Sequence, residues 1–232
     1  GLGDARMSML EFEHVSYQYP GEDFDIIDDL SFSVESGSFH CIIGVSGCGK
    51  STIFRMTNGL LRPKSGTIRV GGKSIAEQKH YCGYMPQKDL LFPWRTIGEN
   101  LALPLEIRGG LSKAERRERV DDALADVGRE GCRDKMPDEL SGGMLQRAMI
   151  AAAIVQRPKL LLLDEATSGL DPVVRDEILT IFADFTRDEE HAVLISSHIV
   201  SDLEKICDYI AFLHRGRPVY YPHLTLPTLN SM

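Results

Sequence analysis

The stretch Gly44-Val45-Ser46-Gly47-Cys48-Gly49-Lys50-Ser51-Thr52 decides the fold of this 232-residue chain. It matches G-x-x-x-x-G-K-[ST] at each fixed position, a pattern typical of loops that bind nucleotide phosphates. The apolar run Phe39–Ile43 predicts a strand before the loop, and residues 50–60 predict a helix after it. A strand, a glycine loop and a helix in this order predict an α/β nucleotide-binding core.

Each position of this P-loop has an expected role. The glycines allow backbone N–H groups to surround the β-phosphate of ATP, so we assign residues 44 and 46–52 to nucleotide binding. Lys50 supplies a positive charge to the β- and γ-phosphate oxygens, and the Ser51 hydroxyl is placed to ligate Mg²⁺. Cys48 serves as a spacer. A glycine turn with no ligand would not explain the Lys-Ser pair.

A second element delivers two carboxylates. The run Leu160–Leu163 predicts a buried strand, and Asp164 and Glu165 follow at its carboxyl end, where open α/β sheets bind ligands. We expect Asp164 in the Mg²⁺ shell and Glu165 as the base that polarises the attacking water. Further apolar runs at 192–196 and 209–213, with helices beginning near Pro172 and Ile199, predict a parallel sheet.

A second glycine-rich element, Leu140-Ser141-Gly142-Gly143, predicts the start of another helix, which extends to Gln156. Ser141 stands at the N-cap position, and a helix N-terminus with exposed amides binds anions. We expect Ser141, Gly142 and Gly143 to bind a nucleotide that their own P-loop does not hold. The sequence therefore suggests ATP sandwiched between two copies of the chain.

This element resembles the signature Leu-Ser-Gly-Gly-Gln of the ATP-binding cassette (ABC) family, with Met144 in the last place. Ala166 also departs from the family, since many members have proline there. The resemblance covers about residues 9–220. It implies roles for Gln87 as the Q-loop residue near the metal and the attacking water, Asp171 in the D-loop that crosses to the partner, and His198 as the switch histidine. It further implies that Tyr19 stacks on adenine, although Tyr17 is a neighbouring alternative.

The order of motifs predicts the organisation of the chain. We expect a core at 9–88 and 158–220 with a mainly parallel sheet, an N-terminal antiparallel β subdomain, and a helical insertion at 89–157. Residues 1–8 and 221–232 are expected to be tails. Within the insertion, Ser112 and Glu115 predict a capping box for a helix that runs to about Val127.

Composition excludes several classes of protein. The chain is 43% hydrophobic and 26% charged, which is ordinary for a globular protein, and its longest apolar run is strand-sized. A net charge of −8 argues against a nucleic-acid partner. Five cysteines without a C-x-x-C pair indicate neither a zinc site nor a disulfide framework, and no signal peptide is expected.

The resemblance implies an ATP-hydrolysing subunit that energises a membrane transporter. Its cofactors would be ATP and Mg²⁺, and it would form a head-to-tail dimer with a second copy or a paralogous cassette. Its other partners would be integral membrane permease subunits, with a solute-binding protein acting through the permease. It would lie peripherally on the cytoplasmic face of the membrane.

The direction of transport has competing indications. Residues 88–100 resemble cassettes of the nitrate, sulfonate and taurine importer group, whereas residues 195–204 are more similar to exporters. We favour an importer, because the flank of the Q-loop is the surface that meets a permease. A soluble ABC ATPase acting on nucleic acid or translation is a weaker alternative, since only one short insertion separates Lys50 from Ser141. Phe92 and Trp94, in the segment 90–100, predict either a docking surface or ordinary core packing.

Overall fold

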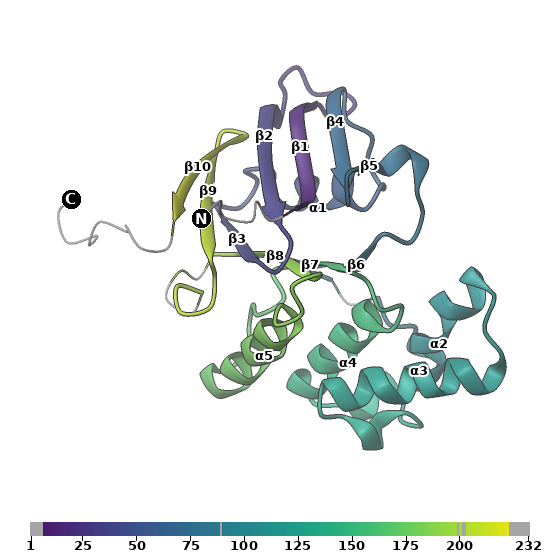
Figure 1. Cartoon of the computed structure of the whole chain (residues 1–232). Helices are drawn as coiled ribbons and strands as arrows, with labels where there is room; N and C mark the ends of the chain where they lie inside the picture. The colour runs from purple at the N-terminus through teal and green to yellow at the C-terminus, as the bar shows by residue number, and fades with distance from the viewer. Residues whose placement is uncertain (1–6, 89, 199, 201–202, 223–232) are drawn as a thin grey trace, which may run out of the picture.

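The computed structural model describes residues 7–88, 90–198, 200 and 203–222. The strands in chain order are β1 (Ser8–Tyr17), β2 (Ile27–Glu35), β3 (Phe39–Ile43), β4 (Ser65–Val70), β5 (Lys73–Ser74), β6 (Cys82–Met85), β7 (Leu160–Asp164), β8 (Ala192–Ser197), β9 (Tyr209–His214) and β10 (Arg217–Pro222). The α-helices are α1 (Lys50–Thr57), α2 (Ile97–Arg108), α3 (Lys113–Asp126), α4 (Gly142–Ile154) and α5 (Pro172–Phe185). Figure 1 shows the strands above and the helices α2 to α5 below.

A six-stranded sheet in the order β10-β9-β3-β8-β7-β6 forms the centre of the molecule. Its strands β6, β7, β8, β3 and β9 pair in parallel, and β10 pairs antiparallel with β9. All residues of β3 and of β7 are buried, as expected for parallel strands covered on both faces. The predicted mainly parallel sheet is therefore confirmed, and the carboxyl ends of β3, β7 and β8 meet at one edge.

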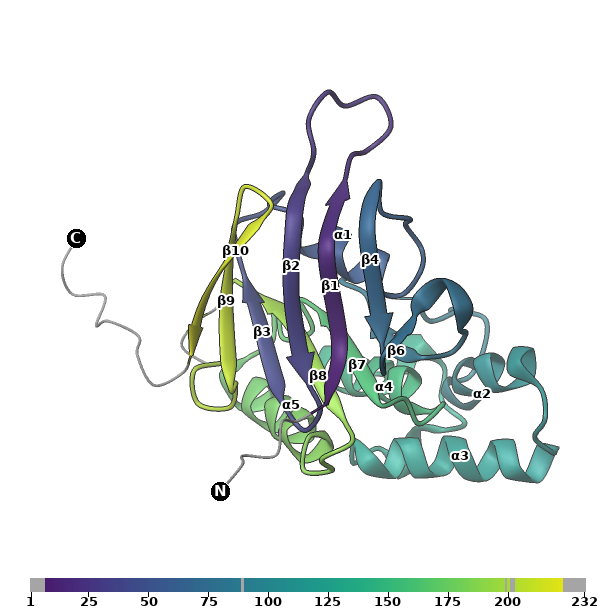
Figure 2. The same ribbon diagram turned by 45° about the horizontal axis from the view of Figure 1, so that its top comes forward.

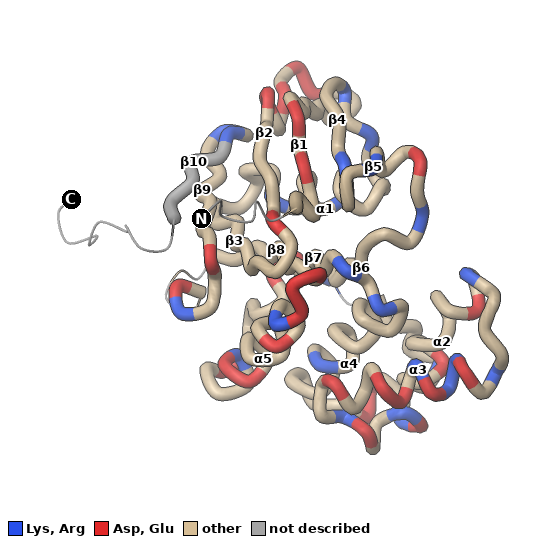
Figure 3. Tube along the Cα trace, viewed as in Figure 1, with Lys and Arg blue, Asp and Glu red and all other residues tan. Residues whose placement is uncertain are grey.

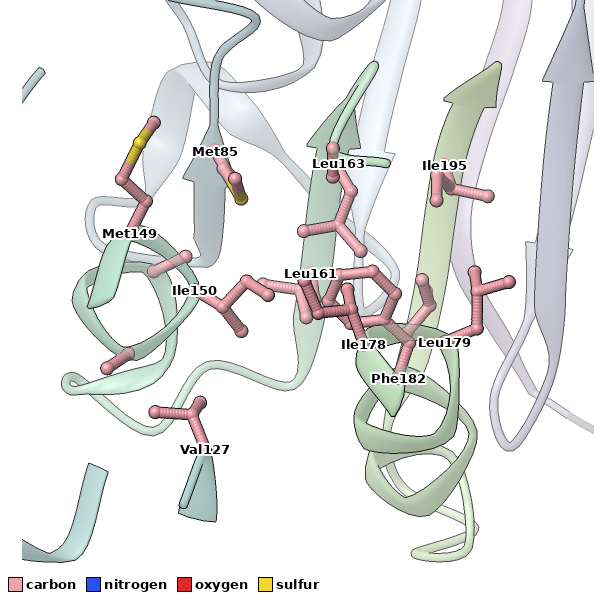
Figure 4. Packing of buried hydrophobic residues seen from close by; sticks show 14 of the residues in the cluster. Met85, Val127, Met149, Ile150, Leu161, Leu163, Ile178, Leu179, Phe182 and Ile195 are labelled. Carbon is pink, nitrogen blue, oxygen red and sulfur yellow. The ribbon is translucent and has the colours of Figure 1, made fainter. Parts of the chain in front are cut away.

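A four-stranded antiparallel sheet in the order β2-β1-β4-β5 confirms the predicted β subdomain. Figure 2 shows β2, β1 and β4 side by side in front of the parallel strands. Alternate residues of β7 serve two cores, because successive side chains of a strand point to opposite faces. Leu160 and Leu162 pack in the core with the antiparallel sheet. Leu161 and Leu163 pack in the core with Ile150 and Phe182 of α4 and α5 (Figure 4).

The helices α2, α3 and α4 lie between β6 and β7 in the sequence, within the expected insertion. Ser112 and Glu115 form the predicted capping box, and Thr96 and Glu99 form a second one that was not predicted. Acidic and basic residues alternate along α3 (Figure 3), which fits a solvated helix face. In the part of the chain that the structure describes, no helix combines the length and apolar character needed to cross a bilayer.

Several element boundaries differ from the prediction. Helix α1 ends at Thr57 and not at residue 60, because Gly59 adopts a left-handed φ of 82° and the amides of Leu60 and Leu61 bond back to the carbonyl of Arg55. Helix α4 ends at Ile154 and not at Gln156. The first strand includes Ser8 and the last includes residues 221–222, which were expected in the tails. The helix expected near Ile199 begins outside the described residues, and residues 203–206 form turns.

Candidate functional site

The P-loop connects β3 to α1 and leaves the start of the helix open. No side chain caps α1, whose N-cap residue Gly49 has a left-handed φ of 104°. A Cβ on Gly49 would lie 2.6 Å from Cδ1 of Ile27, and one on Gly44 would collide with Sγ of Cys48. The left-handed φ therefore favours glycine at position 49, and the first amides of α1 remain available to an anion.

Lys50 is held by the loop that it follows. Its Nζ donates to the carbonyl of Gly44 and, at 3.4 Å, to that of Val45. The carboxylate of Glu165 lies 3.7 Å from Nζ, and each of these two side chains is only 9% exposed. A cation and a carboxylate are thus brought together in a largely dry site, where their charges act strongly on a bound ligand.

The ends of β7 and β8 form a network around the two predicted carboxylates. Asp164 is buried, and its Oδ1 accepts a hydrogen bond of 2.8 Å from Oγ of Ser196. The backbone N–H of Glu165 donates to the same Ser196 oxygen at 3.0 Å. Nδ1 of His198 lies 2.9 Å from Oε2 of Glu165. Glu165 has a left-handed φ of 54°, a conformation that is costly for a residue other than glycine and clusters at functional sites.

These groups surround a cavity of about 350 Å³, a size suited to a small-molecule ligand. Its lining consists of Tyr19, Ile26, Val45, Ser46, Gly47, Gly49, Lys50, Ser51, Thr52, Gln87, Glu165 and His198. The structure thus gathers residues that were singled out from five separate segments of the sequence. Gly44, Cys48 and Asp164 were also predicted for this site, but they do not line the cavity.

Tyr19 reaches the cavity, whereas Tyr17 does not. Oη of Tyr19 lies 2.8 Å from Oγ1 of Thr52, which ties the end of the antiparallel sheet to α1. Tyr17 is buried, and its ring meets that of Tyr19 edge to face with centroids 4.9 Å apart. The geometry therefore favours Tyr19 as the predicted adenine contact.

Oxygen donors suited to Mg²⁺ occur in and near the cavity. Ser51 and Gln87 line it, and Asp164 lies behind it at the end of β7. Among the described residues, no three His, Cys, Asp or Glu side chains gather to hold a metal ion. Mg²⁺ is commonly bound by one or two carboxylates together with substrate phosphates. The residues present therefore fit a Mg²⁺ ion that arrives with a nucleotide.

The second glycine-rich element lies apart from this cavity. Ser141 caps α4 as predicted, and its Oγ accepts from the amide of Met144 at 3.4 Å. Asp171 caps α5 by accepting from the amides of Val173 and Val174 at 3.1 Å each. A Cβ added to Gly143 would lie 3.0 Å from Cγ1 of Val174, so the starts of α4 and α5 adjoin. Neither element contributes a residue to the cavity lining.

Contacts along α4 connect this helix to the segment that follows β7. The side-chain amide of Gln146 donates to the carbonyl of Ala166, the residue after Glu165. Arg147 donates to the carbonyl of Val127 at 3.0 Å and pairs with Glu177 of α5. The two glycine-rich sites are thus parts of one packed structure.

Ser196 was not predicted as a site residue, although it contacts the carboxylate of Asp164 and the backbone N–H of Glu165. A polar residue at the end of an apolar strand is the signal that marks it. The matched register of β7 and β8, in which Asp164 pairs with Ser196, is what brings it to the site.

The sequence matches the ABC transporter family over residues 27–168, which is more than half of the chain. The chain belongs to the ABC transporter family. Its relatives include the methionine import ATP-binding protein MetN of Geobacillus kaustophilus, 38% identical over 221 residues, and that of Bacillus subtilis, 36% identical over 221 residues. Each alignment covers 91% of this chain but 64% of the relative, so the chain spans less than two thirds of their length.

Solved ABC structures share the fold. One is cbiO1 from Clostridium perfringens, part of the ABC transporter complex cbiONQ, with a TM-score of 0.83 and 28% identity over 93% of this chain and 89% of that one. Another is a bacterial ABC transporter cassette solved as a dimer, with a TM-score of 0.82 and 25% identity over 93% of this chain and 99% of that one. The resemblance to the family is confirmed, while the narrower likeness to nitrate, sulfonate and taurine importers stays a prediction.

Proposed function

We propose that this chain binds and hydrolyses MgATP as the energising subunit of an ABC importer. The observation that carries the proposal is the single cavity in which Lys50, Glu165 and His198 meet the open start of α1. The import proteins among the relatives support an importer over an exporter. Their names point to methionine, which supports a small solute as cargo.

The geometry suggests how the residues of the chain divide the work. The Lys50 ammonium exchanges its loop carbonyls for phosphate oxygens, and the amides of α1 bind the same phosphates. Glu165 accepts a proton from the attacking water. The oxygen of that water bonds to the γ-phosphorus, and the bond between the γ-phosphorus and the β–γ bridging oxygen breaks. His198 holds Oε2 of Glu165 in place. Ser51, Gln87 and Asp164 would hold Mg²⁺, which supplies positive charge to the phosphates.

Ser141, Gly142, Gly143 and Asp171 complete the site from a second subunit in this proposal. Two observations support it: these residues lie away from the cavity of their own chain, and a similar cassette has been solved as a dimer. The second subunit is another copy of this chain or a paralogous cassette. Two-fold symmetry then gives two equivalent nucleotide sites.

The segment 90–95 supplies a surface for a permease subunit. Leu90 is 65% exposed, Phe92 38% and Trp94 70%, which supports a surface role for Leu90 and Trp94 in particular. Beside them a groove of about 300 Å³ is lined by Pro86, Leu91, Leu103 and Met149, among others. Exposed apolar side chains beside a groove are typical of sites that receive a helix. The chain would then lie peripherally on the cytoplasmic face of a membrane, with a solute-binding protein acting through the permease.

Replacing Lys50 tests the nucleotide site. Lys50→Ala should weaken MgATP binding by more than about tenfold, because it removes the charge that faces the β- and γ-phosphates. Isothermal titration calorimetry measures the change, with the exposed Lys73→Ala as a control that should bind normally. Undiminished affinity in Lys50→Ala would refute the assignment.

Replacing Phe92 and Trp94 tests the docking surface. Phe92→Ser with Trp94→Ser should leave ATPase activity unchanged and alter the free energy of unfolding by less than about 1 kcal/mol, since surface changes have small effects. The double variant should fail to co-purify with permease subunits. A loss of about 3 kcal/mol or more would instead indicate core packing and move the docking surface elsewhere.

A further inference from the structure

The hydroxyl of Ser196 contacts both residues of the predicted acidic pair, through the carboxylate of Asp164 and the backbone N–H of Glu165. It is fully buried near the end of β8 and pairs in register with Asp164 at the end of β7. Its O–H donates to Oδ1 of Asp164 at 2.8 Å, and its oxygen accepts from the amide of Glu165 at 3.0 Å. A hydroxyl can donate and accept at once, so a single side chain satisfies both neighbours.

The backbone of Glu165 depends on this contact. Its φ of 54° lies in the left-handed region, which side chains other than glycine rarely adopt. In that conformation its N–H donates to the Ser196 hydroxyl at 3.0 Å. Without this acceptor the N–H would lack its hydrogen bond, and the strained conformation would lose its support.

The strand that carries Ser196 also fixes the other end of Glu165. His198, two residues later, contacts the Glu165 carboxylate at 2.9 Å, so β8 and the residue after it hold both the backbone and the side chain. For Asp164, the Ser196 bond occupies one carboxylate oxygen and fixes the rotation of the group. The second oxygen, Oδ2, has no part in this bond and would be the one free to join a Mg²⁺ shell.

We propose that Ser196 is a positioning residue for ATP hydrolysis, which aligns the metal-binding carboxylate and the water-polarising carboxylate together. The inference rests on the proposed function of the site. In this proposal one buried hydroxyl aligns Asp164 and Glu165, whose side chains must keep a fixed separation in the transition state. Outer-shell partners of this kind are worth about 10- to 100-fold in activity or metal affinity.

The test compares Ser196→Ala with the matched control Ser38→Ala. Ser38 is also buried and bonds a carbonyl, that of Glu35, but it precedes β3 at the opposite edge of the same sheet. Ser196→Ala should lower kcat about 10- to 100-fold, leave the KM for ATP nearly unchanged, and raise the Mg²⁺ concentration needed for half-maximal activity. Ser38→Ala should leave all three values unchanged.

A second pair of variants separates the hydroxyl from the volume of the side chain. Ser196→Thr keeps the hydroxyl and Ser196→Val replaces it with a methyl group of similar size, so Thr should retain far more activity than Val. Amide hydrogen exchange of Glu165, measured by NMR without nucleotide, should accelerate in the Ala and Val variants and stay slow in Thr. This readout requires no catalysis.

The outcomes distinguish the two proposals. A wild-type chain that does not hydrolyse MgATP would overturn the proposed function, while Glu165 amide exchange would still decide whether Ser196 supports that residue. An active wild type with equal kcat, equal Mg²⁺ dependence and equal Glu165 exchange in Thr and Val would overturn the role of Ser196 alone. Equal losses in Ser196→Ala and Ser38→Ala would also overturn it, because they would indicate a general packing effect.

Discussion

Helices α1 and α4 both begin at glycine-rich turns, yet the chain supports the two starts in opposite ways. At α1 no side chain caps the helix, and the backbone needs glycine at position 49 to avoid Ile27. At α4 the hydroxyl of Ser141 caps the helix, and a Cβ on Gly142 would meet no atom within 4 Å beyond its own helix. Glycine at 142 is therefore not required by the packing of its own chain.

The groups around the starts of α1 and α4 also differ. The start of α1, which includes Lys50, lines one cavity together with Glu165 and His198. The start of α4 adjoins the start of α5 and contributes nothing to that cavity. Charged groups of the same chain thus surround the start of α1, whereas the start of α4 has none of them beside it and would act, in our proposal, on a nucleotide held by a second subunit.

The largest expected effect tests whether ATP is hydrolysed in the cavity at the start of α1. Glu165→Gln should reduce ATP turnover by about 10²- to 10⁴-fold, because an amide cannot accept the proton of the attacking water. Nucleotide binding should persist, since Lys50 and the amides of α1 are unchanged. Steady-state phosphate release measures the loss. Glu139→Gln, an exposed change just before α4, should retain wild-type turnover, and near-normal activity in Glu165→Gln would sink the assignment.

The next effect tests whether α4 acts on another subunit. The Glu165→Gln chain should dimerise with ATP and return to monomer with ADP, as light scattering would report. Adding Ser141→Arg should abolish this dimer, because a bulky side chain would fill the γ-phosphate site, while ATP binding by the monomer remains. Ser112→Arg at the capped start of α3 provides the matched control, since it removes a cap without touching the proposed interface. An ATP dimer that survives Ser141→Arg would contradict the sandwich.

The smallest effect compares the two glycines directly. Gly49→Ala should lower the free energy of unfolding by about 1–3 kcal/mol, because its left-handed φ and the contact with Ile27 penalise a Cβ. Gly142→Ala should instead raise the free energy of unfolding by up to about 1 kcal/mol, because alanine favours a helix. Urea unfolding monitored by circular dichroism measures both. Equal destabilisation by the two substitutions would contradict the conclusion that glycine is needed at position 49 but not at position 142.

Local rules predicted most of the fold and much of the candidate site. The P-loop, the acidic pair after β7 and the caps at Ser112 and Ser141 each follow from residue types at short fixed spacings. The role of Ser196 could not be predicted this way, because it depends on the register between two strands that are 27 residues apart in sequence. The exposure of Trp94 was equally open, since an aromatic residue in a loop fits a core or a surface.

The direction of transport and the cargo were not readable from the residues of the site. The cavity contains groups that fit a nucleotide and Mg²⁺, and none of these distinguishes one transported solute from another. The preference for import came from residues 88–100, outside the catalytic groups, and the import proteins among the relatives support it. In the function proposed above other polypeptides would recognise the solute, so the nucleotide site of this chain would carry little record of it.

The buried side chain of Asn100 gives the exposed segment around Trp94 a particular thermodynamic character. Its Oδ1 accepts from the amide of Phe92 at 2.7 Å, and its Nδ2 lies within 3.2 Å of the carbonyls of Phe92, Arg95 and Thr96. The loop is therefore ordered before any partner arrives, and its conformational entropy is already lost when the chain folds. A partner that binds there meets a rigid template, so association costs less entropy than it would with a flexible loop.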